Sequence, residues 1–397
     1  MDDLHMHTKA EPSIFTLLLM ISFPVVNAVL ITPALPAIAS FFNVSNQTAQ
    51  HVVTWYLVGY ALGQLIYGPL ANRFGRKPAL YMGVGLQIAS SLFCVLAGVV
   101  NEFPLLITGR FTLALGAGVG LKMAFTLVNE CYEPKIVSQK VSYLMLAFAI
   151  TPGLAMALGG YLTDQYGWMS CFYAGAVYGI LLLLLLVKLP ETKKVLDYDA
   201  LKIKHLLRSY SEQFKNVQLF SGGLLMGLTT CFVYIFATIA PFVAINLLGM
   251  SSQEYGVANI IPSVGYVVFA IATAKLATKY HLESIILAGI LIVAVGIALM
   301  FLAMLVHLPA LVSLFIPITI IYFGEVLIYP NTSALAMSTA VDKAHASAVM
   351  NFLTIGLPTI AVLSMGLFSI STLLLPIIFS GLCIAIIVVY KWVTAVR

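Results

Sequence analysis

The chain has 397 residues, of which 61% are hydrophobic and 9% are charged, with a formal net charge of +5. Soluble globular proteins carry about 25% charged residues, so the composition excludes the soluble enzyme classes and indicates an integral membrane protein. Apolar runs such as residues 180–187 are unbroken, whereas the strands of a membrane barrel alternate apolar and polar residues. The spans are therefore predicted to be α-helices.

The apolar segments predict twelve transmembrane helices, because a helix needs about 20 residues to cross the hydrocarbon core. The first six are predicted over residues 13–37, 49–71, 79–100, 104–129, 139–163 and 168–189. The second six are predicted over residues 218–247, 254–278, 283–306, 309–339, 345–367 and 370–392. Residues 1–189 and 218–397 are thus expected to form one bundle each. The cytoplasmic linker, residues 190–217, mixes apolar residues with lysines and is predicted to hold an amphipathic helix.

The basic residues predict how the chain is oriented. Of the 20 Lys and Arg residues, all except Arg110 and Lys122 fall on one side of the membrane if the helices alternate. Cytoplasmic loops are enriched in Lys and Arg, so both termini of this inner (plasma) membrane protein are predicted to be cytoplasmic. These cations face anionic lipid, and the lipid bilayer accounts for the positive charge without a nucleic-acid partner.

Short matches between the two halves indicate an internal repeat. Residues 70–75 align with residues 276–281, and Gly83 beyond the first aligns with Gly289 beyond the second. Residues 31–33 align with residues 239–241 at nearly the same offset. The predicted fold is an all-α membrane protein of twelve transmembrane helices in two pseudo-symmetric six-helix bundles. Parallel repeats of this kind build transporters whose halves rock around a substrate site near the membrane midplane.

The loop after the second span carries the most specific motif, GPLANRFGRKP at residues 68–78. It resembles the cytoplasmic loop signature of the major facilitator superfamily, G-x-x-x-D-R-x-G-R-[RK]. Its basic cluster is predicted to pair with helix carbonyls and with acids of the opposite half, and so to latch one conformation. The predicted latch residues are Gly68, Asn72, Arg73, Gly75 and Arg76. Asn72 stands where the family usually has Asp, and an amide forms no ion pair, so a weaker latch is expected.

The resemblance extends over nearly the whole chain, to the multidrug-facilitator and bicyclomycin/chloramphenicol-resistance branches. Residues 32–39 resemble the end of helix one, and residues 251–256 resemble the start of helix eight. Pro152, Gly159 and Gly160 match the helix-five antiporter signature and are the predicted hinge. These branches exchange lipophilic compounds for protons, so the resemblance implies proton-coupled export of a small amphipathic compound by alternating access. Such a transporter needs no cofactor or metal, and it is expected to function as a monomer.

Three departures from those branches weaken the antiport prediction. The first span has no acid near Asn27, where the branches usually carry one. Leu113 replaces the Gln that normally follows Arg110 at the third position. Ala155 and Met156 occupy the places of a helix-bending Gly-Pro pair.

Charged residues within the spans provide other candidates, since such residues usually face a bundle interior or an aqueous cavity. The resemblance puts helices one, four, seven and ten around that cavity. The predicted substrate or proton residues are Asn27, Arg110, Lys122, Tyr234, Glu325 and Tyr329. Two kinds of interpretation remain open. The first is a charged substrate site or a proton-titrating carboxylate paired with a base. The second is structural: an ion pair, Lys122 reaching toward the cytoplasmic membrane surface, or Arg110 bonded to carbonyl groups of helix one or helix two. The first also allows a dedicated carrier for a charged metabolite, such as an anionic siderophore, an amino acid or a nucleoside.

The chain carries no HExxH, Walker A or Gly-x-Ser-x-Gly motif, so no enzyme activity is predicted. An intramembrane enzyme would need a catalytic cluster at one depth, and a channel would not need a latch between two halves. A secondary transporter for a small molecule is therefore the favoured prediction.

Overall fold

The computed structural model describes residues 11–193, 196–197, 216–276, 279–337 and 343–395. Within these residues the chain forms helices and no strand. The amphipathic helix predicted in the linker falls mainly on residues 198–215, outside the described residues. That helix and the exact limits of the two bundles therefore stay predictions.

The described helices form two sets in chain order. The first set is α1 (Ile14–Val29), η1 (Thr32–Ala34), α2 (Leu35–Phe41), α3 (Asn46–Ala49), α4 (His51–Phe74), α5 (Arg76–Val99), α6 (Phe103–Ala117), α7 (Val119–Cys131), α8 (Pro134–Tyr166) and α9 (Met169–Leu186). The second set is α11 (Val217–Pro241), η2 (Phe242–Leu247), α12 (Ser252–Ala258), α13 (Ile260–Leu276), α14 (Leu282–Leu305), η3 (Leu311–Phe315), α15 (Ile316–Met337), α16 (Lys343–Met365) and α17 (Leu374–Ala395).

These elements confirm the prediction of twelve spans. Ten helical segments of the described residues are long and apolar enough to cross a membrane, and α4 and α16, of 24 and 23 residues, complete two sets of six. Several helices extend past the predicted limits; α8, for example, begins at Pro134 rather than at residue 139. Apolar patterns locate the lipid-buried part of a helix, whereas its backbone hydrogen bonds continue into the polar flanks.

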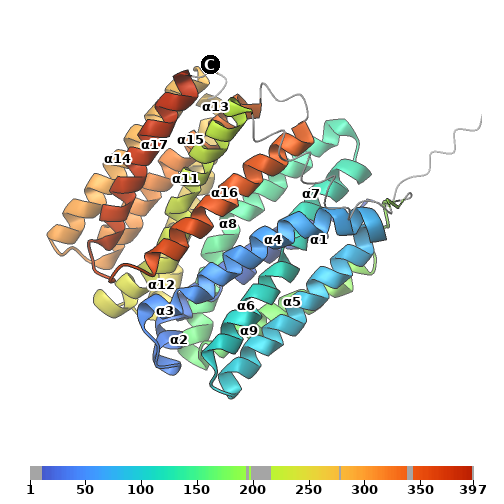
Figure 1. Ribbon diagram of the computed structural model, residues 1–397, viewed down its shortest axis with the longest axis horizontal. Coiled ribbons are helices and arrows are strands. Elements are labelled where there is room, and N and C mark those ends of the chain that lie inside the picture. Colours follow the sequence, from blue (N-terminus) through green and yellow to red (C-terminus); the bar gives the residue numbers. More distant parts are fainter. Residues whose placement is uncertain (1–10, 194–195, 198–215, 277–278, 338–342, 396–397) are drawn as a thin grey trace, which may run out of the picture.

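Matching helix pairs pack together in the two halves, as the internal repeat predicts. In the first half α4 and α5 pack on α6, and α1 packs on α8. In the second half α13 and α14 pack on α15, and α11 packs on α16. Contacts between the halves follow the repeat as well. Helix α8 of the first half packs on α12 and α13 of the second half, and the equivalent helix α16 of the second half packs on α4 of the first (Figure 1).

A pair of glycines marks the same helix crossing in each half. A Cβ atom on Gly116 of α6 would lie 2.5 Å from the carbonyl oxygen of Gly83 in α5. A Cβ atom on Gly324 of α15 would likewise lie 2.5 Å from the carbonyl oxygen of Gly289 in α14. Backbones approach this closely only without side chains between them, so both crossings depend on glycine.

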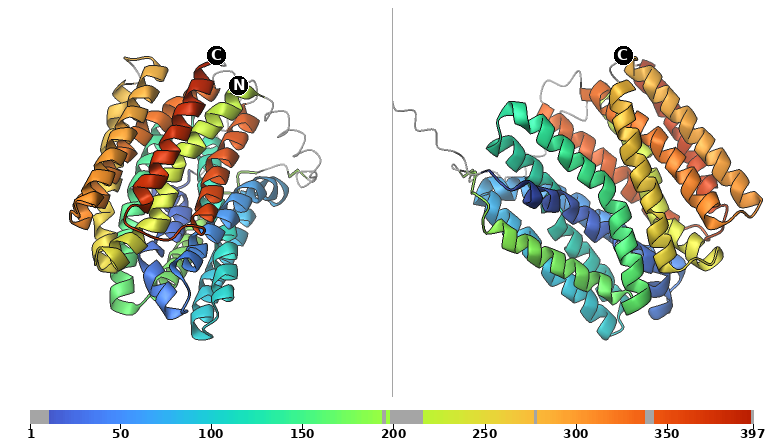
Figure 2. Two further views of the ribbon diagram at one scale, coloured as in Figure 1. Left: turned by 60° about the vertical axis from the view of Figure 1, so that its left-hand side comes forward. Right: turned by 180° about the vertical axis from the view of Figure 1, so that it is seen from behind.

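The two halves are joined mainly at one end of the molecule. We name the end with the loops at residues 72–77 and 131–135 the basic end, and the end with α2, α3 and α12 the opposite end (Figure 1). One apolar cluster of buried residues contains both halves, and its members from the first half lie at the opposite end. Toward the basic end, separate clusters belong to the first and the second half. Figure 2 shows α8 running beside α13 and the halves diverging toward the basic end.

Candidate functional site

Tyrosines from both halves converge at the middle of the interface. The hydroxyl group of Tyr60 in α4 lies close enough to those of Tyr234 in α11 and Tyr329 in α15 to interact with them electrostatically. Tyr56, one turn earlier in α4, stacks on Tyr60 with ring centroids 6.3 Å apart and also lies within range of Tyr234. We call these four side chains the tyrosine cluster. The cluster brings the predicted residues Tyr234 and Tyr329 together, because α4, α11 and α15 face each other across the interface.

Glu325 lies next to this cluster, in the middle of α15. Its side chain is 4% exposed, and Tyr234, Tyr266 and Tyr322 lie within its electrostatic range. Among the described residues no cationic nitrogen lies within 4.0 Å of its carboxyl group, and Oε2 has no hydrogen-bond partner. A neutral carboxyl group costs far less to bury than a carboxylate without a cation. The site is therefore suited to a carboxyl group that holds a proton.

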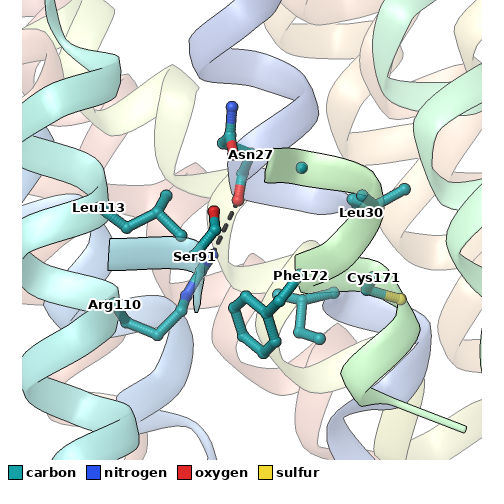
Figure 3. Close-up of a pocket in the computed structure, with 9 residues that line it drawn as sticks. Asn27, Leu30, Ser91, Arg110, Leu113, Cys171 and Phe172 are labelled. Carbon is teal, nitrogen blue, oxygen red and sulfur yellow. Dashed lines mark hydrogen bonds between the residues drawn. The ribbon is translucent and has the colours of Figure 1, made fainter. Parts of the chain in front are cut away.

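Arg110 ties the first-half helices together. It is 1% exposed, and its guanidinium lies 4.4 Å from the ring centroid of Tyr56. Nη1 donates to the carbonyl oxygen of Asn27 at 2.8 Å (Figure 3). Nη2 donates to that of Ala28 at 3.4 Å, and Nε donates to that of Val52 at 3.0 Å. The carbonyl groups in the last turn of a helix have no partner within that helix, so Arg110 caps the end of α1.

The side chain of Asn27 belongs to a buried amide network within the first half. Its Oδ1 accepts a hydrogen bond of 2.7 Å from Nε2 of Gln87 in α5. The same Nε2 donates to Oγ of Ser91 at 3.0 Å and to the carbonyl oxygen of Gly175 in α9 at 3.1 Å. Sequence reasoning missed Gln87, although a Gln and two serines in an apolar helix are a usable signal.

Lys122 of α7 also contacts the backbone of its own half. Its Nζ donates to the carbonyl oxygen of Gln64 in α4 at 3.0 Å. Gly68, one turn further along α4, makes room for it, because a Cβ atom there would lie 2.5 Å from Nζ. Neither Lys122 nor Arg110 lies within ion-pair distance of Glu325 in the part of the chain that the structure describes.

At the basic end, Arg76 is paired with an acid of its own half. Its Nη2 lies 2.7 Å from Oε1 of Glu130 at the end of α7, and its Nη1 donates to Oδ1 of Asn72 at 2.8 Å. The carboxylate of Glu191 accepts the backbone N–H groups of Arg76 and Lys77 at 3.0 and 2.9 Å. In this conformation the acids at the loop are thus Glu130 of the first half and Glu191 of the linker.

Gly75 and Arg73, in the loop at residues 72–77, each contact a nearby side chain. Gly75 adopts a φ of 104°, and a Cβ atom there would lie 2.7 Å from Oε2 of Glu191. The Arg73 guanidinium lies 5.9 Å from the ring centroid of Phe74. Sequence reasoning did not find Glu191, which acts as a cap for α5 from beyond the end of α9.

The predicted hinge glycines lie in the closest contacts of α8. The helix is continuous through Pro152. A Cβ atom on Gly159 would collide with the carbonyl oxygen of Leu30, in the first half, and one on Gly160 with that of Ser252, in the second half. Gly159 therefore faces the bundle of its own half, and Gly160 faces the other half.

Two bundles related by a repeat, with buried polar groups at their interface, are the architecture of a secondary transporter. The Major Facilitator Superfamily model matches residues 16–362, and the chain belongs to this family. It is therefore a multi-pass inner-membrane transporter for a small molecule, in a family of transporters rather than enzymes.

Several relatives in sequence carry drug-resistance names, in agreement with the branches that the motifs resemble. The chloramphenicol resistance protein CraA of Acinetobacter baumannii is 26% identical over 325 residues, which cover 82% of this chain and 78% of that protein. The multidrug resistance protein MdtL of Escherichia coli is 31% identical over 222 residues, 56% of this chain and 55% of that protein.

Solved structures share the fold. A D-xylose–proton symporter superposes with a TM-score of 0.75 at 15% identity, covering 95% of this chain and 97% of that chain. The inward-open xylose transporter XylE from E. coli superposes with a TM-score of 0.74 at 16% identity, covering 96% of each chain. At such low identity these structures support the fold alone.

Proposed function

We propose that the protein exports a small amphipathic compound in exchange for protons, by alternating access between its two halves. The observation that carries this proposal is Glu325 beside the tyrosine cluster at the interface of the halves. Its carboxyl group is buried, and no described residue provides a cation for it. The drug-resistance relatives supply the substrate class.

The described conformation corresponds to one end state of that cycle. The halves share an apolar core at the opposite end and have separate cores toward the basic end. Because Lys and Arg concentrate on the cytoplasmic side, the basic end is assigned to the cytoplasm. The state is then inward-facing, and a substrate reaches the tyrosine cluster from the cytoplasm.

Proton exchange at Glu325 would link the gradient to substrate movement. In the inward-facing state the carboxyl group has no cation and favours its neutral form. The carboxyl group takes up that proton while the halves are open to the outside. In the inward-facing state, water or a substrate that enters from the cytoplasm stabilises the carboxylate, and the proton is released there. A carboxyl group that alternates between these surroundings meets the basic requirement of coupling, and the apolar and aromatic surroundings accommodate the apolar part of a substrate.

The test separates coupling from binding. Purified protein in proteoliposomes is supplied with a transported lipophilic compound and a pH gradient. Glu325→Gln is expected to abolish uphill transport and to retain counterflow, because an amide has the shape of the acid without its proton. The exposed Glu102→Gln variant is the matched control and is expected to behave as wild type. Undiminished uphill transport by Glu325→Gln would exclude Glu325 as the coupling group.

A second function is favoured by Lys122, an amine within a membrane span. Only the carbonyl oxygen of Gln64 accepts a hydrogen bond from its Nζ in the described region, and no carboxylate lies within 4.0 Å of it. A cation in this position suits a carrier for a charged metabolite with an anionic group.

A further inference from the structure

Arg110 is a buried cation that no acidic side chain neutralises in the described part of the chain. The ionisable groups within its electrostatic range are Tyr56, Cys94 and Cys171, which are neutral in their ordinary forms. Its three carbonyl partners provide partial charges only. Buried charges in proteins are normally compensated by a counter-charge. One negative charge beside Arg110 would therefore stabilise its buried positive charge.

A cavity lies beside this guanidinium, inside the first half. The volume open to the centre of a water-sized sphere is about 10 Å³, which is room for one water molecule or one small ion. The lining residues are Asn27, Leu30, Ile31, Ser91, Arg110, Leu113, Cys171, Phe172 and Gly175. They come from α1 and the turn after it, and from α5, α6 and α9, so the cavity lies within one bundle and does not involve the second half. Figure 3 shows Arg110, Ser91 and Phe172 next to one another around this space, with Cys171 further along its wall.

The polar groups of the cavity have hydrogen-bond donors to spare. A guanidinium carries five N–H donors, and three of them are directed at carbonyl oxygens of Asn27, Ala28 and Val52. Ser91 is 0% exposed, and its Oγ accepts a hydrogen bond from Gln87. Within the described residues the Ser91 hydroxyl proton has no acceptor. A positive charge with free donors, and with no carboxylate beside it, favours an anion over a cation.

The walls restrict the size of that anion. Leu30, Leu113 and Phe172 form the apolar part of the lining, and they offer no further donors to a phosphate or a sulfate. A halide needs few donors and accepts them from any direction. We propose that the cavity binds one chloride-type monovalent anion, held by Arg110 and the hydroxyl group of Ser91. The anion lies outside the transport interface and stabilises the contact of α6 with the end of α1.

Thermal unfolding of the purified full-length protein tests this binding. Sodium chloride and sodium gluconate are compared at equal ionic strength, because gluconate is too large for the cavity. Chloride and bromide are expected to raise the unfolding temperature in a saturable manner, and gluconate is not. A hydrogen bond to a charged group contributes ~1.5–3 kcal/mol, so Ser91→Ala should weaken chloride binding by roughly tenfold or more.

The neighbouring serine provides the matched control. Ser90 is also buried in α5 but does not line the cavity, so Ser90→Ala should keep the wild-type response to chloride. An equal chloride response in Ser91→Ala and wild type would overturn the proposal, as would equal unfolding temperatures in chloride and gluconate.

Bromide locates the site directly and needs no variant. Crystals of the wild-type protein grown in sodium bromide should show an anomalous scattering peak between Arg110 and Ser91. Density without an anomalous signal in the cavity would assign it to water and overturn the proposal. This measurement also decides the matter if Ser91→Ala fails to fold. Neither experiment depends on transport, so the result is independent of the proposed export activity.

Discussion

Arg110 and Lys122 are both cations inside the membrane, and both contact main-chain carbonyl groups. The planar guanidinium of Arg110 binds carbonyls from two helices at once, whereas the amine of Lys122 binds one. This difference follows from side-chain chemistry, because Arg offers a fixed fork of donors and Lys a flexible point charge. Arg110 of α6 therefore holds α1 and α4 together, and Lys122 is the more replaceable of the two.

Replacement of Lys122 tests the carrier for a charged metabolite. Under the export proposal, Lys122→Ala and Lys122→Arg bind neutral, cationic and anionic ligands as wild type does, because Nζ serves only to hold Gln64. Binding is measured by ligand-induced thermal shifts on purified protein. Asn129→Ala, an exposed position two turns further along α7, is the control. A selective loss of anionic ligands in Lys122→Ala, with recovery in Lys122→Arg, would instead support the charged-metabolite carrier.

At the scale of helices, α8 is the element that connects the bundle of the first half to the second half. Gly159 contacts α1's end through Leu30, and Gly160 contacts the start of α12 through Ser252. Gly256 of α12 contacts the carbonyl oxygen of Met156 in return. Adjacent positions of one helix thus serve two different packing interfaces, one within a bundle and one between the halves, and the proposed alternating access has to open the second.

Alanine at these positions should separate the two interfaces. Gly159→Ala forces apart helices of one bundle and is expected to lower stability by ~1–3 kcal/mol, seen as a lower unfolding temperature. Gly160→Ala disturbs only the contact between halves, so its fold should persist while the inward-facing state loses population. Accessibility of a cysteine at the opposite end to a thiol reagent reports that population. Identical effects of both variants on stability and accessibility would contradict this division of roles.

Sequence reasoning located the helices better than it located their contacts. The bilayer requires an apolar stretch for every span, so the pattern that predicts α14 is almost independent of its neighbours. The partners of Arg110 are main-chain oxygens, which every residue possesses, and no sequence pattern distinguishes Asn27 and Val52 as acceptors. The Glu191 cap was missed for a similar reason, since a loop acid reaches the start of α5 only through the fold. The repeat, in contrast, was readable because Gly83 and Gly289 occupy equivalent crossings.

At the scale of the whole molecule, the two halves are joined at the opposite end by few polar contacts among the described residues. The backbone N–H of Gln253 donates to Oδ2 of Asp164 at 2.8 Å, across the two halves. The close approaches of α8 and α12 lie in the same region. A motion that opens this end has to break these contacts. Each bundle, held by its glycine helix crossing, would move as one unit.

A cross-link at this end should trap the inward-facing state. The double variant Asp164→Cys with Gln253→Cys places two thiols at neighbouring exposed positions, and the five native cysteines are buried. A short bis-methanethiosulfonate cross-linker, which attaches to each thiol through a disulfide, is expected to abolish transport because the opposite end no longer opens. Reductant cleaves these disulfides and should restore transport. Each single variant is the control and should retain transport. Full transport by cross-linked protein would show that this end does not open during the cycle.

The apolar cluster that joins the halves also has a bearing on energy conservation. Leu30 and Leu35 from the first half, together with Phe242 and Val243 from the second, are at most 4% exposed within it. Buried hydrocarbon side chains form an electrical insulator across that part of the membrane. A protein whose interface admits protons from one side must keep this seal dry when no substrate is present, or it would short-circuit the gradient. Under the proposed proton coupling, the seal would determine the resting proton leak that the cell has to tolerate in order to keep the transporter in its membrane.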